Sequence, residues 1–339
     1  MECCHPDLDP ARTRRAAAGV NWPGFVDVVD RHRIAGLAVR ALAGIVPERW
    51  AAELADRGRR DAAANLRAAA ACAELERRFA AAGVRRLYLK GLTLSVLAYG
   101  SPSIKASADI DILVAPDDIA AAVGVLVEAG FALADPAGLP LDRLGQWHRH
   151  HKETNWVRGA DRVAVDLHSR LADSPALLTL GVDAPAQRVA VGGGIVLPTL
   201  AADLLPAYLA VHGASSCWFR LKWIADFAAL CGDLGAKELE REAAMLGAER
   251  PMAQALLLAN ALFGLFGDRR DPLLASRANR RMVALALGTI GGREPTERRL
   301  GTLAIHRNQL LMKAGPRFVA GEAWRQARAA WSNRMLRGL

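Results

Sequence analysis

The spacing of apolar residues along the chain changes twice. From residue 22 to residue 82 they recur at helical spacing, with a break at residues 44–47 and a glycine at position 83 that suits a helix C′ position. From 84 to 199, short runs rich in strand-forming residues alternate with turns and short helical stretches. From Leu200 onward helical spacing returns. The predicted order is therefore helices, a small α/β segment, and helices again.

The middle segment predicts the elements of a small sheet. Strands are expected at residues 84–89, 109–114, 153–158 and 162–168, and helices at 92–99 and from about 116 to 129. The third and fourth strands flank a short Gly-Ala-Asp turn and predict a hairpin. A second hairpin is predicted at 187–191 and 195–197, where three consecutive glycines fit a turn better than a phosphate-binding loop.

These elements predict a small α/β core flanked by N-terminal helices and a C-terminal helical region. We expect a flexible N-terminus over residues 1–20, a helical region over 21–83, the core over 84–199 and a helical domain over 200–339. The amphipathic run at 318–337 predicts a terminal packing helix rather than a membrane-surface helix.

Two aspartates interrupt the apolar run of the second predicted strand. In a strand, Asp109 and Asp111 project to one face, while Ile110 and Ile112 project to the other. Two like charges side by side repel each other. A divalent cation such as Mg²⁺, which prefers carboxylate oxygens, removes that repulsion. The D-x-D pattern therefore predicts a metal site. A solvated surface strand fits less well, because the run continues as apolar residues.

Asp166 and the pair Lys90-Gly91 supply complementary parts. Asp166 shares a strand face with His168, so three carboxylates from two strands could converge on one or two Mg²⁺ ions that bind the phosphates of a nucleoside triphosphate. Lys90 and Gly91 stand at a strand-to-helix junction. There, a glycine lets phosphate approach the backbone and the helix N-terminus offers free N–H groups. The alternative for Asp166 is a structural acid paired with a nearby arginine.

Composition limits the classes of partner. The chain has 339 residues, of which 52% are hydrophobic, and a net charge of +9. Basic patches attract phosphates and nucleic acid, but these arginines are scattered and only 6% of residues are aromatic, so stable nucleic-acid binding is not expected. The five irregularly spaced cysteines predict free thiols, with Cys3 and Cys4 in a loose terminus. Because no long apolar run occurs, we expect a cytoplasmic protein without membrane contact.

Together these motifs resemble the nucleotidyltransferase superfamily with the DNA-polymerase-β-like catalytic fold. They are most similar to a bacterial group with the pattern L-K-G-x-x-L, R-x-x-x-D-I-D-L-L-V and V-D-L-H, found here at residues 89–94, 105–114 and 165–168. Residues 212–230 resemble the H…W-x-R-L-x-W-x-x-D stretch of the same group. Lys105 stands where the group usually has arginine, which keeps the charge but loses the bidentate fork.

The resemblance implies an α+β fold with a small mixed β-sheet core and flanking helices. It also implies that the protein is a Mg²⁺- or Mn²⁺-dependent nucleotidyltransferase. It would move a nucleoside monophosphate from a triphosphate, with ATP expected first, to a hydroxyl or phosphate of a small-molecule, peptide or protein acceptor. The implied metal ligands and catalytic residues are three carboxylates: Asp109, Asp111 and Asp166. The candidates for binding the nucleotide are basic residues and one glycine: Lys90, Gly91, Lys105, Arg220 and Lys222.

Two other functions and one histidine cluster stay open. The chain could be a catalytically weak nucleotide-binding regulatory or interaction protein, although all three carboxylates are present. It could modify nucleic-acid ends, although no RNA-binding module is recognisable. His148, His150 and His151 fit a loop near the acceptor or plain surface better than a zinc site. His168 is interpreted as a hydrogen-bonded sheet-edge histidine rather than a general base.

Overall fold

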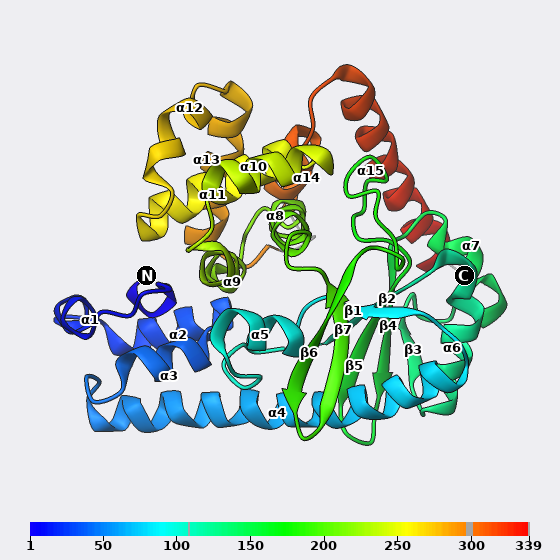
Figure 1. Ribbon diagram of the computed structural model, residues 1–339, viewed down its shortest axis with the longest axis horizontal. Helices are drawn as coiled ribbons and strands as arrows, with labels where there is room; N and C mark the ends of the chain where they lie inside the picture. Colours follow the sequence, from blue (N-terminus) through cyan, green and yellow to red (C-terminus); the bar gives the residue numbers. More distant parts are fainter. Residues whose placement is uncertain (108, 296–300, 338–339) are drawn as a thin grey trace.

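The computed structural model describes residues 1–107, 109–295 and 301–337. It shows an α+β protein with a small mixed sheet and flanking helices, as predicted (Figure 1). The main sheet has the strand order β1-β2-β5-β4-β3. Strands β2 and β5 run parallel, and the other neighbouring pairs are antiparallel. The strands have these bounds: β1 Arg86–Tyr88, β2 Ile110–Val114, β3 Ala132–Asp135, β4 Glu153–Arg158 and β5 Val163–His168.

Helices cover the sheet and form both ends of the chain. The N-terminal and core helices are α1 Pro10–Ala17, α2 Trp22–His32, α3 Ala35–Leu42, α4 Glu48–Ala81, α5 Leu92–Tyr99, α6 Ile119–Glu128 and α7 Leu144–His148. The C-terminal helices are α8 Leu205–Ser215, α9 Leu221–Cys231, α10 Ala236–Met245, α11 Glu249–Phe263, α12 Arg270–Leu274, α13 Arg277–Gly291, α14 Leu303–Leu311 and α15 Pro316–Arg337. Short 3₁₀ turns lie at Glu2–Cys4, Pro116–Asp118, Leu141–Arg143 and Gly267–Arg269.

Helix α4 is 34 residues long and runs beneath both the N-terminal helices and the sheet (Figure 1). Its alanine-rich sequence favours a continuous helix. It begins after Pro47, within the predicted break, and it is followed by Gly83, whose φ of +67° is the left-handed conformation that ends helices. Both ends of this helix were predicted correctly to within one residue.

The second predicted hairpin forms a separate two-stranded sheet. Strands β6 Ala186–Gly192 and β7 Ile195–Leu200 pair antiparallel. Gly192, Gly193 and Gly194 all have positive φ values at the turn, which explains why three glycines stand there. Beyond Leu200 the described residues form no strand, as predicted. The edge strand β3 and the short helix α7 were not predicted, because β3 is short and mostly exposed and carries no clear alternation.

Alternation divides the sheet into an apolar face and a functional face. Ile110 and Ile112 of β2, with Val165 and Leu167 of β5, pack in one core with the second half of α4 and with α6. Asp111 lies between the two isoleucines in sequence and faces the opposite way, into a cleft. The predicted separation of apolar and acidic side chains is therefore confirmed for these strands.

A second, larger core joins the N-terminal helices to the C-terminal ones, and it contains Cys3 and Cys4. These two thiols are 7% and 3% exposed, so the expectation of a loose terminus around them is wrong. The reason is local: the first residues form a 3₁₀ turn that packs against α3 and α9. All five cysteines are free thiols, as predicted. The domain boundaries after residues 83 and 199 stay predictions.

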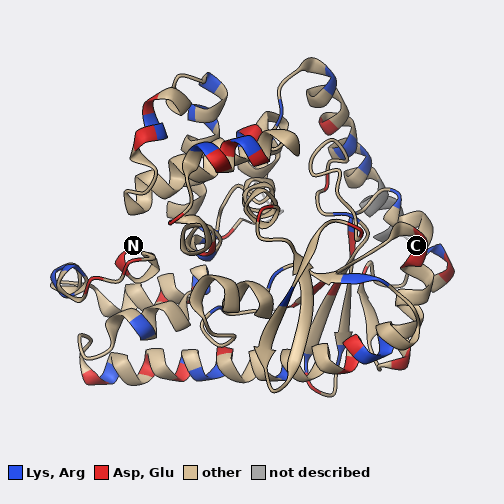
Figure 2. Cartoon of the chain, viewed as in Figure 1, with Lys and Arg blue, Asp and Glu red and all other residues tan. Residues whose placement is uncertain are grey.

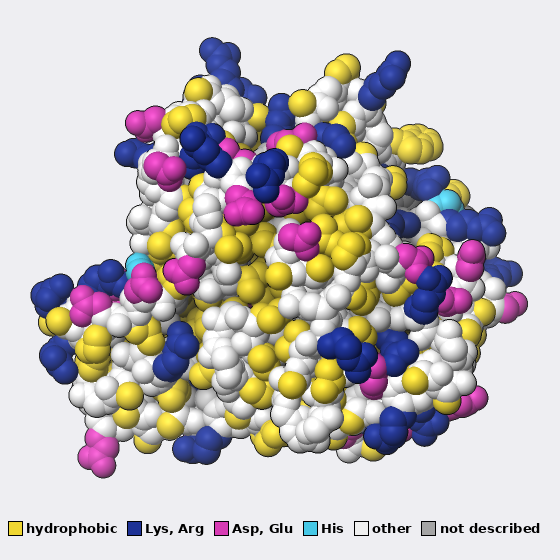
Figure 3. Space-filling model, in the orientation of Figure 1, with side chains coloured by type: hydrophobic (Ala, Val, Ile, Leu, Met, Phe, Trp, Pro, Cys, Tyr) yellow, Lys and Arg dark blue, Asp and Glu magenta, His cyan; other side chains and the backbone are white. Residues whose placement is uncertain are grey.

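Charged residues lie mainly on the outer surfaces. Figure 2 shows charged residues spaced along α4 and on α10 and α15. In Figure 3, hydrophobic side chains gather across the middle of the viewed face, between these charged regions. The predicted terminal helix is present as α15, and it packs against α14 while Trp324 is 69% exposed. Within the described residues, each helix is too short or too polar to cross a bilayer.

Candidate active site

A cleft of about 380 Å³ lies between the functional face of the main sheet and the C-terminal helices. A cavity of this volume is at the lower end of the range for small-molecule sites. It is lined by all of the residues predicted from the sequence to bind metal or nucleotide: Lys90, Gly91, Lys105, Asp109, Asp111, Asp166, Arg220 and Lys222. Residues from several parts of the chain therefore meet in one place. Their individual roles stay predictions.

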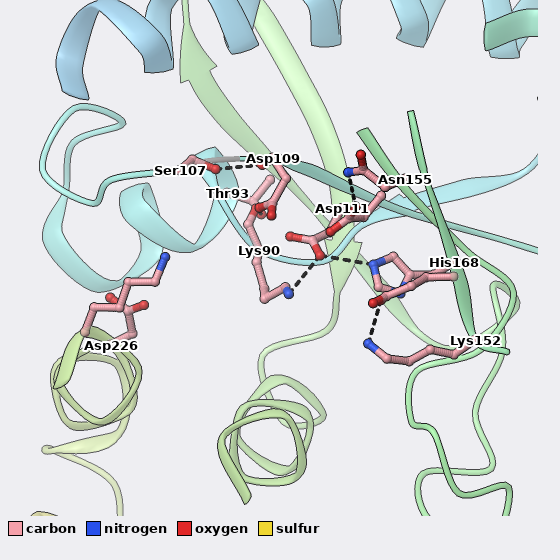
Figure 4. A network of polar contacts seen from close by, with 12 residues as sticks. Lys90, Thr93, Ser107, Asp109, Asp111, Lys152, Asn155, His168 and Asp226 are labelled. Atoms are coloured by element: carbon pink, nitrogen blue, oxygen red, sulfur yellow. Dashed lines mark hydrogen bonds and ion pairs between the residues drawn. The ribbon is translucent and has the colours of Figure 1, made fainter. Parts of the chain in front are cut away.

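Two of the predicted carboxylates come from neighbouring parallel strands. Asp111 of β2 stands directly opposite Asp166 of β5 in the strand register, so both side chains leave the same face at the same height. His168 follows two residues later on β5. One ligand atom from each of these three residues lies within 4.8 Å of the others. Figure 4 shows Asp111 and His168 side by side in this group. This group has the size and the donor atoms for a divalent cation. Asp109 lines the same cleft but is outside this closest group.

The two carboxylates differ in their electrostatic environment. Burial alone would raise the pKa of Asp111, but the Lys90 ammonium at 2.8 Å and the His168 imidazole at 3.0 Å outweigh it and hold that pKa well below its usual value. Burial, and after it the charges of the neighbouring carboxylates, raise the pKa of Asp166 to about 7. Asp166 accepts a hydrogen bond from Asn155 Nδ2 at 2.8 Å. The predicted alternative of an arginine partner is therefore not observed for Asp166.

The Lys90-Gly91 junction joins β1 to α5 beside this carboxylate group (Figure 4). Gly91 has a φ of +65°, a conformation that favours glycine. A Cβ atom at this position would lie 2.8 Å from Ser107 Oγ, closer than atoms normally approach. Thr93 Oγ1 donates a hydrogen bond to the Lys90 carbonyl at 3.1 Å. Glycine is therefore required here by backbone conformation as well as by space.

The other side of the cleft carries buried positive charge. Lys105 is 7% exposed, and its Nζ lies 3.4 Å from Asp226 Oδ2. Lys222 is 8% exposed, and its Nζ donates to the Ala106 carbonyl at 3.4 Å. Burial, and after it the nearby charge of Lys105, lower the pKa of Lys222 to about 7. Arg220 precedes α9 and pairs with Glu294.

The histidine predictions need correction. His168 lies on β5, the central strand of the main sheet, so it is not a sheet-edge residue. Its Nε2 contacts Asp111, and its Nδ1 lies 3.2 Å from Glu153 Oε2. His148 is 4% exposed and contacts the Ser169 and Thr154 hydroxyls, so it is neither plain surface nor a loop residue. Burial lowers the pKa of His148 to about 4.

Several cleft residues were missed in the sequence. Glu153 is the antiparallel partner of His168 in the β4–β5 hairpin, so pairing the two predicted strands residue by residue would have found it. Lys152 precedes it and forms an ion pair with it at 2.6 Å. Arg33 and Trp223 also line the cleft. No local signal marks Arg33, because it reaches the cleft only through the packing of α2.

Comparison with known proteins gives the family. A search of curated proteins finds no match. A family model described as an uncharacterised nucleotidyltransferase matches residues 18–264, which span most of the chain, including the sheet and the residues of the cleft. The chain therefore belongs to this nucleotidyltransferase family and is a transferase.

Proposed function

We propose that this nucleotidyltransferase uses Mg²⁺ or Mn²⁺ to transfer a nucleoside monophosphate from a triphosphate, ATP first, to a small-molecule, peptide or protein acceptor. The observation that carries the proposal is the juxtaposition of Asp111 and Asp166 on neighbouring strands. Burial and, after it, the charges of the neighbouring carboxylates raise the pKa of Asp166, so the ionised pair is unfavourable without a cation. A bound divalent cation would relieve that repulsion, so the residues fit the ion.

Asp109, Asp111 and Asp166 would hold the cation, with His168 next to them. Carboxylate oxygens suit both Mg²⁺ and Mn²⁺, and a nearby imidazole suits Mn²⁺ better than Mg²⁺. When bound, the ion would neutralise phosphate charge and polarise the α-phosphorus towards attack. Lys90 would then be released from its 2.8 Å ion pair with Asp111 and become available to phosphate.

The basic side of the cleft would bind the triphosphate. Lys105, Lys222 and Arg220 line it together with Lys90 and Gly91. The ammonium of Lys222 has no carboxylate within ion-pair distance among the described residues, and a buried charge of this kind is stabilised by an anion. Negative and positive groups therefore face each other across the cleft, as the binding of a metal–triphosphate complex requires.

The chemistry would proceed by displacement at the α-phosphorus. The acceptor oxygen forms a bond to the α-phosphorus, the bond to the bridging oxygen breaks, and pyrophosphate leaves with that oxygen. An acceptor hydroxyl loses its proton, and the carboxylate of Asp166, which lines the cleft, would take it.

The volume of the cleft supports a small acceptor or a flexible chain end. A cavity of about 380 Å³ is too small for a duplex or a folded surface. This supports a small-molecule acceptor, or a peptide or protein segment that can enter the cleft as an extended chain. It disfavours a duplex nucleic-acid end as the acceptor.

The proposal is tested by following labelled phosphate. The protein is incubated with Mg²⁺, an extract of its source cells, and each triphosphate labelled at either the α- or the γ-phosphate. Label should appear in an acceptor only from the α-labelled nucleotide, and Asp111→Asn should abolish it. Asp56→Asn, on the exposed surface of α4, is the matched control and should keep full transfer. Transfer of γ-label instead, or equal transfer by Asp111→Asn, would show that the protein is not working as proposed.

A further inference from the structure

The loop between α5 and β2 leads directly into the strand that carries Asp111, and its described residues, 100–107 and 109, form no helix or strand. Its backbone is nevertheless bonded by side chains from several helices. Ser95 of α5 is fully buried. Its hydroxyl donates to the Ser101 carbonyl at 2.6 Å and accepts from the Lys105 N–H at 3.1 Å. Helix α3 also touches the loop, since a Cβ at Gly36 would lie 2.2 Å from the Ile104 carbonyl oxygen.

Asn65 of α4 makes the most complete set of bonds to this loop. Its Nδ2 donates to the carbonyls of Pro102 and Lys105, each at 2.8 Å, and its Oδ1 accepts from the Ser107 N–H at 3.2 Å. Both amide hydrogens and the amide oxygen are therefore used. Asn65 is 3% exposed in an alanine-rich helix, where an unbonded amide would be unfavourable. The loop supplies the partners that make an asparagine tolerable at this position.

These bonds continue from Asn65 to the metal-binding residues. Ser107, whose N–H is bound by Asn65, donates its hydroxyl to the Asp109 carbonyl at 2.8 Å (Figure 4). Gly91 leaves the space that this hydroxyl occupies. Two residues before Ser107, the side chain of Lys105 is held by Asp226, which also accepts a hydrogen bond from the Tyr99 hydroxyl at 2.8 Å. The position of Asp109 thus depends on a chain of contacts that begins on α4.

We propose that Asn65 is a positioning residue: by holding the loop it places Asp109 beside Asp111 and Asp166 before the cation arrives. This inference rests on the proposed function, because it assigns Asp109 to the metal site. A loose loop would have to become ordered when the cation binds, and that loss of entropy would weaken binding. A loop that is already held avoids the loss, so Asn65 should raise metal affinity without touching the metal.

The test measures metal affinity rather than turnover. Mn²⁺ is titrated into the full-length protein without nucleotide, and the free ion is followed by its electron paramagnetic resonance signal. Asn65→Ser should weaken Mn²⁺ binding about tenfold, at the low end of the range for residues that orient metal ligands. The matched control is Asn279→Ser on α13, which removes a similarly buried amide that donates to the Leu273 carbonyl at 2.9 Å outside the cleft. It should leave Mn²⁺ affinity unchanged even if it lowers stability.

A second variant tests the contact with Asp109 itself. Ser107→Ala removes only the hydroxyl that bonds the Asp109 carbonyl, and it should weaken Mn²⁺ binding several-fold. Because both residues act through the same contacts, the double variant should lose less affinity than the two single losses combined. If circular dichroism shows that Asn65→Ser does not fold, the Mn²⁺ affinity of Ser107→Ala alone decides whether the loop positions Asp109.

The outcomes separate this inference from the proposed function. If the wild type binds Mn²⁺ and either Asn65→Ser or Ser107→Ala binds it with the same affinity, the positioning role is overturned and the proposed function still stands. An equal loss in Asn279→Ser also overturns it, since general destabilisation would then explain the effect. Failure of the wild-type protein to bind Mn²⁺ at all refutes the metal site, and the inference falls with it.

Discussion

Replacing Asp166 by asparagine should stabilise the metal-free protein and abolish its stabilisation by metal. Asparagine keeps the shape of the side chain and can still accept the hydrogen bond from Asn155, but it cannot ionise. The pKa of Asp166 rises from 3.8 to about 7 in the folded protein. A shift of roughly three pH units corresponds to about 4 kcal/mol, which is the upper limit of the destabilisation that its charge causes.

The direction of the Asp166 pKa shift predicts how the stability of the protein changes with pH. A carboxyl group with a raised pKa binds its proton more tightly in the folded state, so its contribution to stability falls as pH rises from 3.8 to about 7 and is constant above that. Asp166→Asn has no such dependence. The variant should therefore match the wild type at low pH and gain stability over it across this window, with the full advantage reached by about pH 8.

The assay is thermal unfolding in EDTA and in excess Mg²⁺, at several pH values. In EDTA at alkaline pH, Asp166→Asn should unfold at a higher temperature than the wild type. Excess Mg²⁺ should close or reverse the gap, because a ligand at about 100 times its Kd stabilises the binding-competent protein by about 2.7 kcal/mol. Asp56→Asn should follow the wild type throughout. The reasoning is refuted if Asp166→Asn is no more stable in EDTA, or if Mg²⁺ stabilises it as much as the wild type.

Three further predictions concern other residues. Gly91→Val should weaken triphosphate binding in a calorimetric titration, because the valine Cβ would meet Ser107 Oγ at a φ that disfavours β-branched residues; Gly124→Val, at an open helical position, should bind normally. Triphosphate affinity should fall as pH rises through about 7, because Lys222 loses its charge there, and Lys222→Arg should remove this dependence; an unchanged profile would contradict the role of this lysine. Burial holds the folded-state pKa of His148 near 4, below the unfolded value of 6.5. As pH falls from 6.5 to 4, the wild type should therefore lose stability relative to His148→Gln, by at most about 1.4 kcal/mol per pH unit. Denaturation measured across this range would contradict the prediction if the stabilities of the two proteins changed in parallel.

The parts of the fold that were predictable are those with a local signal. Alternation in β2 and β5 was sufficient to assign Asp111 and Asp166 to one face, and their opposition in the sheet then followed from the pairing of the strands. Glycines marked the helix ends and hairpin turns. The parallel pairing of β2 with β5 has no such signal, because it depends on how distant segments pack together.

The parts of the site that escaped prediction depend on contacts between residues far apart in the chain. Lys105, in the loop before β2, pairs with Asp226 of the C-terminal helix α9. Asn65 is one polar residue in an alanine-rich helix and gives no hint in the sequence that it bonds a loop 40 residues away. The burial of Cys3 and Cys4 likewise comes from packing between α3 and α9, which a polar, arginine-rich terminus conceals.

The course of helix α4 decides which fragments of this protein can be produced separately. The second half of α4 supplies Cys72, Leu75 and Phe79 to the core beneath the sheet. A fragment that starts at the first strand would therefore expose Ile110, Val165 and their neighbours to water, and it should aggregate when expressed. A fragment that starts at Glu48 keeps this cover. Family members that consist of a shorter catalytic unit would need another helix, or a partner chain, in the place of α4.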